Sequence, residues 1–262
     1  MCGRYASFRE GQQLADELAV AIVADDARLL GPSWNVAPTD GVRIVVDRPD
    51  QQGEVVRQLR VARWGLVPSW AKDQSIGSRL VNARAESLER SNAFARPFAV
   101  RRALLPADGY YEWQRLEAGG RRPRKQPFYI HPADGGPLAL AGLYEFWRDA
   151  TKAADDPDRW LVTAVVITRP ASPELAHIHD RQPLMLTPDL WDAWLDPAVG
   201  AEGAEPLLGA QPPRLLAQPV TDAVNSVRNN GPELLTPAPP EPANVSPPAP
   251  APSPPAAGRP AR

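Results

Sequence analysis

Apolar and polar positions alternate along much of the chain in short runs typical of strands. The sequence predicts strands over 42–46, 55–64, 104–113, 128–130, 138–146 and 160–168. Leu14, Leu18 and Ile22 recur at helical spacing, which predicts a helix over 8–23. Proline after Ser172 and after Thr187 predicts two further short helices, since proline favours the first helical position. Many short strands with few helices favour a mainly β or α+β domain with a partly closed sheet.

Turn residues divide these runs. The segments 32–39 and 64–70 are predicted as loops that combine tryptophan with proline or glycine, and 81–89 is expected to start extended and continue as a helix. The last 32 residues, from Gly231, hold 12 of the 32 prolines and no aromatic residue. Such a composition is typical of a disordered, polyproline-like segment. We therefore predict a folded domain over 1–231 and a proline-rich tail over 232–262.

Composition narrows the class of protein. The chain has 262 residues, of which 43% are hydrophobic and 23% charged, as in ordinary globular proteins. The sequence has no apolar run long enough to span a bilayer and no basic segment followed by an apolar one at its start. A single cysteine excludes an intramolecular disulfide and a cysteine-rich metal site. These features predict a cytoplasmic protein that makes no membrane contact.

The net charge of the chain does not exclude a nucleic-acid partner. The formal net charge of −2 argues against a generally basic binder, so any such site must concentrate its arginines on one face. Arginine clusters occur over 96–102 and 121–125, and eight tryptophans offer stacking surfaces. Because tryptophan is usually well buried, we expect Trp147, Trp160, Trp191 and Trp194 to be structural.

Cys2, the only cysteine, lies one residue from the start of the chain. If Met1 is removed, Cys2 carries a thiol and a free α-amine on adjacent carbons, a pair that can close on an aldehyde as a thiazolidine ring. The two groups titrate at about 8.5 and about 7.7–8.0, so both nucleophilic forms are accessible near neutral pH. Arg4 adds a cation that favours the thiolate and attracts phosphate. The alternative is an ordinary frayed chain end that bears a chance thiol.

Three internal segments add candidate chemistry. Asn82 offers a donor and an acceptor two residues before Arg84; the alternative, which these residues by themselves favour, is an ordinary strand-to-helix junction. Glu112 lies between Tyr111 and Trp113, where desolvation would raise its pKa and suit it to proton transfer, unless it simply points outward.

His177 and His179 are two of only three histidines. Their spacing places both on one face of an extended segment, but no third ligand completes a metal site. His179, beside Asp180 and Arg181, suits proton transfer near a phosphate; the alternative is a histidine whose neighbours satisfy it in a loop.

Taken together, these segments resemble the SOS response-associated peptidase family, whose members are also described as abasic-site processing proteins. The matching motifs occur in the family's order: Met1-Cys2-Gly3-Arg4-Tyr5, Trp34-Asn35-Val36-Ala37-Pro38-Thr39, Trp64-Gly65-Leu66-Val67-Pro68-Ser69-Trp70, Asn82-Ala83-Arg84-Ala85-Glu86, Gly109-Tyr110-Tyr111-Glu112-Trp113, His179-Asp180-Arg181-Gln182-Pro183 and Asn225-Ser226-Val227-Arg228-Asn229-Asn230. One departure is Gln182, where the family usually has methionine, and it raises a question about local packing.

The resemblance implies a compact α+β domain around a barrel-like, mainly antiparallel sheet with short peripheral helices. It implies binding of single-stranded DNA that contains abasic sites, and a thiazolidine crosslink from mature Cys2 to the opened sugar. Lyase-like activity, release of the protein's own Met1 and a part in the SOS response to DNA damage belong to the same expectation, as do a monomer, the absence of cofactor and metal, and localisation at the nucleoid on binding DNA.

The resemblance also implies residue roles. Asn82 orients the terminal amine or the sugar, Glu112 shuttles protons, and His179 assists imine formation and its reversal. The expected DNA contacts are Arg4, Asn35, Pro38, Trp70, Arg84 and Arg181. Two alternatives stay open: a cysteine peptidase that uses Cys2 and His179, and a non-catalytic single-stranded DNA binding module.

Overall fold

A closed five-stranded barrel forms the centre of the molecule. The computed structural model describes residues 2–116 and 124–239. The barrel strands are β4 (Gly41–Pro49), β5 (Val55–Trp64), β7 (Arg102–Ala107), β10 (Leu138–Arg148) and β11 (Trp160–Pro170). The sequence β5-β4-β7-β10-β11 is antiparallel throughout, and a parallel pairing of β11 with β5 at Ala164↔Trp64 closes it. The predicted α+β domain with a barrel-like, mainly antiparallel sheet is confirmed.

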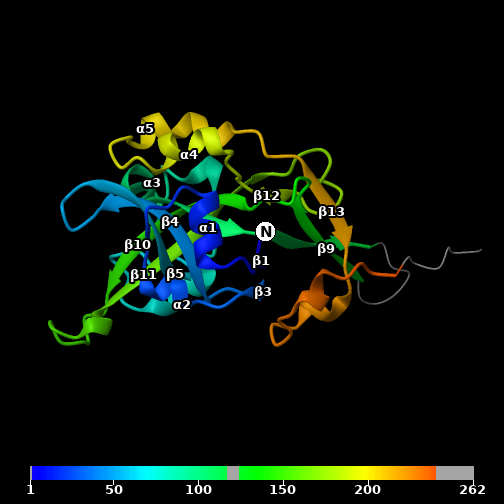
Figure 1. Ribbon diagram of the computed structural model, residues 1–262, viewed down its shortest axis with the longest axis horizontal. Coiled ribbons are helices and arrows are strands. Elements are labelled where there is room, and N and C mark those ends of the chain that lie inside the picture. Colours follow the sequence, from blue (N-terminus) through cyan, green and yellow to red (C-terminus); the bar gives the residue numbers. More distant parts are fainter. Residues whose placement is uncertain (1, 117–123, 240–262) are drawn as a thin grey trace, which may run out of the picture.

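Further strands extend the barrel and build a second sheet beside it. β2 (Ile22–Val23), β6 (Asn82–Arg84) and β12 (Arg181–Pro183) pair with β5 or β11. The second sheet has the order β13 (Leu215–Pro219), β9 (Lys125–Pro132), β8 (Gly109–Arg115), β1 (Tyr5–Ser7) and β3 (Ser33–Val36). Figure 1 shows β9 and β13 reaching away from the barrel, with β1 near the middle of the molecule.

Short helices and 3₁₀ turns lie around the two sheets. They are α1 (Gly11–Glu17), α2 (Asp25–Leu29), α3 (Ala95–Val100), α4 (Pro188–Leu195) and α5 (Ala201–Ala204), with 3₁₀ turns η1 (Gln74–Arg79), η2 (Ala85–Ser87), η3 (Pro157–Arg159), η4 (Glu205–Gly209), η5 (Asp222–Asn225) and η6 (Pro232–Leu235). In Figure 1, α3, α4 and α5 gather on one side. No helix in the described part of the chain reaches the length and apolarity needed to cross a membrane.

Alternating strand positions fill two different cores. Val45, Leu104 and Val165 pack with the helices outside the barrel. The residues on either side of them in sequence point the other way, as successive strand residues must, and form the barrel interior. Cys2 and Tyr5 join this interior cluster. The start of the chain is thus part of the core.

Several strand predictions hold with changed limits. The run 55–64 is confirmed as β5, while β4 extends beyond 42–46 at both ends. The single run 104–113 is two strands, because Asp108 turns the chain from the barrel into the second sheet, its carboxylate accepting hydrogen bonds from Phe8 N and Arg9 Nε, both at 2.7 Å. The loop predicted over 32–39 is partly wrong, since Ser33–Val36 pairs with β1.

Two helix predictions fail for local reasons. The helix over 8–23 shrinks to α1, because Ala19 has a φ of 53° and residues 22–23 pair with β5. No helix follows Ser172. Ala171 N donates to Asp180 O at 3.0 Å, so the segment between them closes on itself in hydrogen-bonded turns. The helix after Thr187 is confirmed as α4.

Two side chains differ from their expected burial. Trp147, Trp191 and Trp194 are buried as predicted, but Trp160 is 56% exposed, because it begins β11 where the β10–β11 hairpin projects. Arg102, expected within a surface cluster, is buried and donates to the carbonyl oxygens of Phe98 and Trp194. Most of the 121–125 cluster lies outside the described residues.

The packed part of the chain continues past the predicted boundary at residue 231. Pro232–Leu235 forms η6, and Leu234 is fully buried beside Ala6 and Tyr111. Ala238 N donates to Pro219 O at 2.8 Å. The predicted tail from 240 onward lies outside the described residues.

Gly65 joins the end of β5 to the tryptophan-containing loop under tight steric limits. Its φ is 120°, a backbone conformation that residues other than glycine rarely adopt. A Cβ on Gly65 would lie 2.5 Å from Gly77 O, and one on Gly77 would lie 2.6 Å from Gly65 O. Glycine at both positions therefore lets the loop cross η1 in backbone contact.

The Gly65→Ala substitution is expected to destabilise the fold by about 2–4 kcal/mol, the sum of a strained backbone and an overpacked contact. Gly53→Ala is the matched control, because Gly53 also has a positive φ (90°) but open space around it, and should cost about 1 kcal/mol. Urea unfolding of both variants checks this. Equal losses would show that the contact with Gly77 contributes nothing.

Candidate active site

Cys2 is held inside the molecule by strand pairing on both sides of β1. β1 lies between β3 and β8, with Tyr5 opposite Val36 on one side and Tyr110 on the other. Tyr111 N donates to Arg4 O at 3.0 Å and extends the pairing toward the chain start. Cys2 is fully buried. The thiol is thus not at a frayed end.

Asn82 fixes the backbone of Cys2. β6 pairs with β11 at Val166, which places Asn82 beside the first residues of the chain. Its Nδ2 donates to Cys2 O at 2.8 Å. Its Oδ1 is buried and has no hydrogen-bond partner among the described residues. One end of the amide therefore orients Cys2 while the other is available to a ligand.

Glu112 is a buried carboxyl on β8, with only 3% of its surface exposed. Burial raises its pKa to about 7, since desolvation disfavours the charged form. The carboxyl therefore exchanges a proton close to neutral pH. The sequence alternative of an outward-pointing glutamate is wrong.

His179 faces Glu112 from the turn segment before β12. The distance from His179 Nε2 to Glu112 Oε2 is 3.9 Å, too long for a hydrogen bond. Arg181 N donates to His179 Nδ1 at 3.0 Å, which assigns the proton of the neutral ring to Nε2, on the side of Glu112. Asp180 Oδ1 lies 2.9 Å from the same Nδ1 and would accept from it in the charged ring. Burial lowers the pKa of His179 and favours the neutral form.

The environment of the thiol opposes ionisation. Burial raises the pKa of Cys2 well above its usual range, and the charge of Glu112 raises it further. Cys2 Sγ donates to Arg4 O over a long distance of 4.0 Å. A cysteine activated as a free thiolate has the opposite arrangement, with its pKa lowered by cations or a helix terminus.

Three of the predicted DNA contacts engage other parts of the protein. Arg4 Nη1 donates to Asn35 Oδ1 at 2.7 Å and to Val224 O at 3.0 Å. The Asn35 amide, buried, donates to Ser226 O and Asn229 O. These two side chains fasten the segment 224–229 to β3.

Arg181 is likewise engaged. It forms a two-pronged ion pair with Glu86, at 2.6 and 3.0 Å, and donates to Thr168 O at 2.6 Å. These contacts hold β12 against η2 and β11, next to the histidine.

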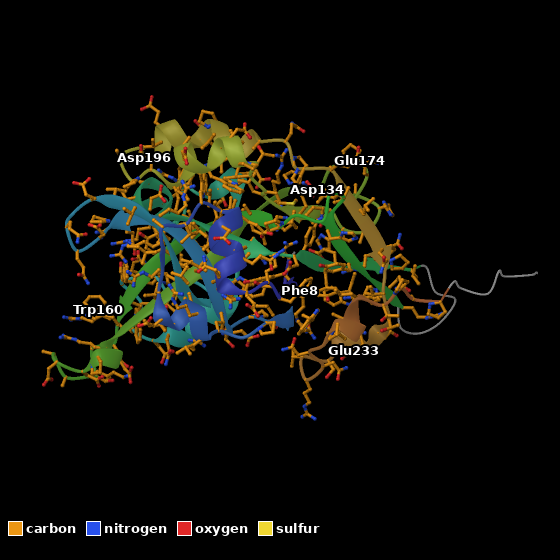
Figure 2. All side chains as sticks on the ribbon, in the orientation of Figure 1. Phe8, Asp134, Trp160, Glu174, Asp196 and Glu233 are labelled. Atoms are coloured by element: carbon orange, nitrogen blue, oxygen red, sulfur yellow. The ribbon has the colours of Figure 1, made fainter. Side chains whose placement is uncertain are left out.

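The other three predicted contacts lie nearer the surface. Arg84 is exposed on β6, two residues beyond Asn82, and Pro38 is half-buried. Trp70 is 60% exposed, and its Nε1 donates to Asn92 O at 3.2 Å. It borders a hollow of about 270 Å³ that Lys72 and Arg79 also line. Figure 2 labels the other strongly exposed tryptophan, Trp160, at the side where the β10–β11 hairpin projects.

Two residues of this region have roles that sequence reasoning did not assign. Gln182 is buried, and its Oε1 accepts from Ser172 N at 2.8 Å, so it anchors the start of the segment that ends in His179. Tyr110 lies on the same face of β8 as Glu112, two residues earlier. Because side chains two residues apart on a strand share a face, the sequence could have indicated that Tyr110 accompanies Glu112.

Within residues 2–116 and 124–239, no group of three or more histidine, cysteine or acidic side chains is placed to hold a metal ion.

Solved structures confirm the architecture. A protein from Bacteroides thetaiotaomicron matches with a TM-score of 0.74 at 22% identity, over 90% of this chain and all of that one. A phage-related protein from Bordetella bronchiseptica matches with a TM-score of 0.62 at 30% identity, over 84% of this chain and 94% of that one.

Sequence comparison gives curated relatives. The chain is 34% identical to the abasic site processing protein YoqW of Bacillus subtilis over 239 residues, covering 90% of this chain and 99% of that protein. It is 30% identical to the abasic site processing protein YedK of Escherichia coli, covering 90% of this chain and all of that protein. The model of the SOS response associated peptidase (SRAP) family matches residues 1–227. The chain therefore belongs to the SOS response associated peptidase family.

Proposed function

We propose that this protein processes abasic sites in single-stranded DNA by bonding Cys2 covalently to the opened sugar. The observation that carries the proposal is the placement of Cys2. Its backbone is hydrogen-bonded to Asn82, and it packs near a buried carboxyl whose pKa is close to neutral. The names of the relatives YoqW and YedK, both abasic site processing proteins, support the same substrate.

The proposed chemistry needs the free α-amine that removal of Met1 creates, and we extend the proposal to self-release of Met1. The amine adds to the aldehyde carbon of the ring-opened sugar and gives a carbinolamine, which loses one water to become an imine. The thiol sulfur then bonds to the imine carbon while the thiol proton passes to the imine nitrogen. The product is a five-membered thiazolidine, and one water is released overall.

Glu112 suits the proton transfers of this sequence. With a pKa of about 7 it can take a proton from the attacking amine and return it to the departing hydroxyl. His179, neutral with its proton on Nε2, faces Glu112 and assists imine formation and the reverse, lyase-like opening. Asn82 fixes Cys2 O, and through it the direction of the amine.

We assign the proposed DNA-binding surface from the predicted contact residues whose side chains are exposed to solvent. Trp70 is the stacking residue, since a base can cover its exposed ring, and Arg84 is the phosphate contact beside Asn82. Pro38 stays a proposed contact. For Arg4, Asn35 and Arg181 we propose positioning roles, because each already binds protein groups that shape the site.

The two alternatives find less support. A peptidase acting through Cys2 and His179 would need an activated thiol, whereas burial raises the pKa of Cys2. A purely non-covalent DNA-binding module has no use for a buried carboxyl near the thiol with a half-buried imidazole facing it. We propose that the protein acts as a monomer.

The Cys2→Ala protein should form no covalent adduct with an oligonucleotide that holds one abasic site, because both the ring-closing sulfur and the stable product are lost. Wild-type protein that retains Met1 should fail as well, since its amine is not on Cys2. Intact-mass measurement after denaturation checks both, with undamaged DNA as control. An adduct of Cys2→Ala would rule out the proposal, and equal affinity for intact and abasic DNA without product would favour the binding module.

The rate of adduct formation should show an inflection near pH 7, because Glu112 must lose its proton to act as a base, below the one at about 7.7–8.0 from the attacking amine. Glu112→Gln should remove the lower inflection, keep the upper one and slow the reaction about 100-fold at pH 8. Single-turnover rates from pH 5 to 9 measure both. A profile that keeps its lower inflection in the variant would remove Glu112 from the mechanism.

Stability provides a check that the Glu112→Gln protein is folded. Folding raises the pKa of Glu112 from about 4.3 to about 7. Between these two pH values the folded wild-type protein therefore binds more protons than the unfolded protein. Its free energy of unfolding falls as pH rises through this window. Glu112→Gln should therefore be more stable than wild type at pH 8, by about 1–3 kcal/mol, and equal to it at pH 4. Urea unfolding at the two values tests this sign.

Trp70→Ala should weaken binding of single-stranded DNA by about 5- to 150-fold, corresponding to about 1–3 kcal/mol for one stacked base. Trp160→Ala is the matched control: Trp160 is exposed to a similar degree, 56% against 60%, but lies on the projecting hairpin. Fluorescence anisotropy with an undamaged oligonucleotide separates the two. Equal losses, or none for Trp70, would contradict the proposed surface.

A further inference from the structure

Tyr110 occupies the same buried region as Cys2. On β8 it lies opposite Tyr5 of β1 and shares a strand face with Glu112. Tyr110 is 1% exposed and packs in the interior cluster that contains Cys2 and Trp64. Its ring is therefore fixed at the end of the barrel where the proposed reaction takes place.

The hydroxyl of Tyr110 is buried and has no hydrogen-bond partner among the described residues. An unmatched buried hydroxyl carries a desolvation cost, so its presence calls for a partner that appears at another stage. Burial raises the pKa of Tyr110 well above its usual value, and the neighbouring charges of Cys2 and then Glu112 raise it further. The Tyr110 hydroxyl thus stays protonated, so it can donate a hydrogen bond to an anion.

The geometry points to Tyr110 as the residue that stabilises the Cys2 sulfur as it loses its proton. We propose that Tyr110 Oη–H donates a hydrogen bond to the thiolate during ring closure, an inference that rests on the proposed function. The sulfur forms its bond to the imine carbon, the former thiol proton ends on the imine nitrogen, and Tyr110 keeps its own proton throughout.

This hydrogen bond would belong mainly to the reacting state. A neutral thiol is a weak acceptor, whereas a thiolate in a dry site is a strong one. An interaction that strengthens as charge develops lowers the barrier without tightening substrate binding. It also offsets part of the penalty that burial places on ionising Cys2.

Tyr110→Phe tests the inference because it removes one oxygen and keeps the ring. We expect adduct formation at saturating DNA to slow about 10- to 100-fold, the range for a hydrogen bond to a charged group, with unchanged DNA affinity. The unfolding midpoint should not fall, since the hydroxyl has no hydrogen-bond partner to lose in the part of the chain that the structure describes.

Tyr111→Phe is the matched control on the same strand. Tyr111 points to the opposite face, and its hydroxyl donates to Trp34 O at 2.8 Å. This variant should lose stability and keep the wild-type rate per folded molecule. Tyr110→Phe should thus lower the reaction rate without lowering stability, and Tyr111→Phe should lower stability without lowering the rate.

A second measurement works without DNA. Tyr5, Tyr110 and Glu112 are among the titratable groups whose charges couple to Cys2, and of these three only Tyr110 changes in Tyr110→Phe. Alkylation of Cys2 by iodoacetamide at one fixed alkaline pH should therefore be slower in Tyr110→Phe than in wild type. A wild type that forms no adduct would defeat the proposed function, yet this slower alkylation would still support the contact. An unchanged alkylation rate, or an unchanged adduct rate in a crosslinking wild type, would overturn it.

Discussion

The pairing of β1 between β3 and β8 is the constraint on which the site depends. Three residues of strand, Tyr5–Ser7, and the added bond from Tyr111 N to Arg4 O carry the chain start into the barrel end. Without this anchor the first residues would be a mobile terminus, with no defined distance to Asn82 or Glu112. The same β8 that holds β1 also supplies Glu112, so anchoring and chemistry share one strand.

Burial then sets the proton chemistry of the site. The same desolvation that raises the pKa of Glu112 to about 7 lowers that of His179 and raises that of Cys2. A carboxyl that changes state near neutrality, facing an imidazole that burial favours in its neutral form, suits a reaction with several proton transfers, such as the proposed imine formation. In the proposed mechanism the thiol, by contrast, stays protonated until the last step, because burial raises its pKa, and the amine attacks first.

The positions of the strands could be predicted from the sequence more accurately than the contacts between distant residues. The alternation of apolar and polar residues predicted both ends of β5 correctly. The motif residues Cys2, Asn82 and Glu112 lie together at one end of the barrel. Periodicity does not encode long-range partners, so it missed the turn at Asp108, whose carboxylate binds Phe8 and Arg9 from the other end of the domain. It likewise gave no sign that Arg181 pairs with Glu86, or that Gln182 anchors Ser172, because these contacts exist only once β12 lies on β11.

The central claim is that both nucleophiles of Cys2 bond to one sugar carbon. Tandem mass spectrometry of the N-terminal peptide, after reaction with abasic DNA and treatment with borohydride and iodoacetamide, tests it most directly. The account predicts a sugar on Cys2 with the mass of a thiazolidine, resistant to reduction and with no alkylated sulfur. A sugar on a lysine, or on Cys2 as a reducible imine with a free thiol, would contradict it.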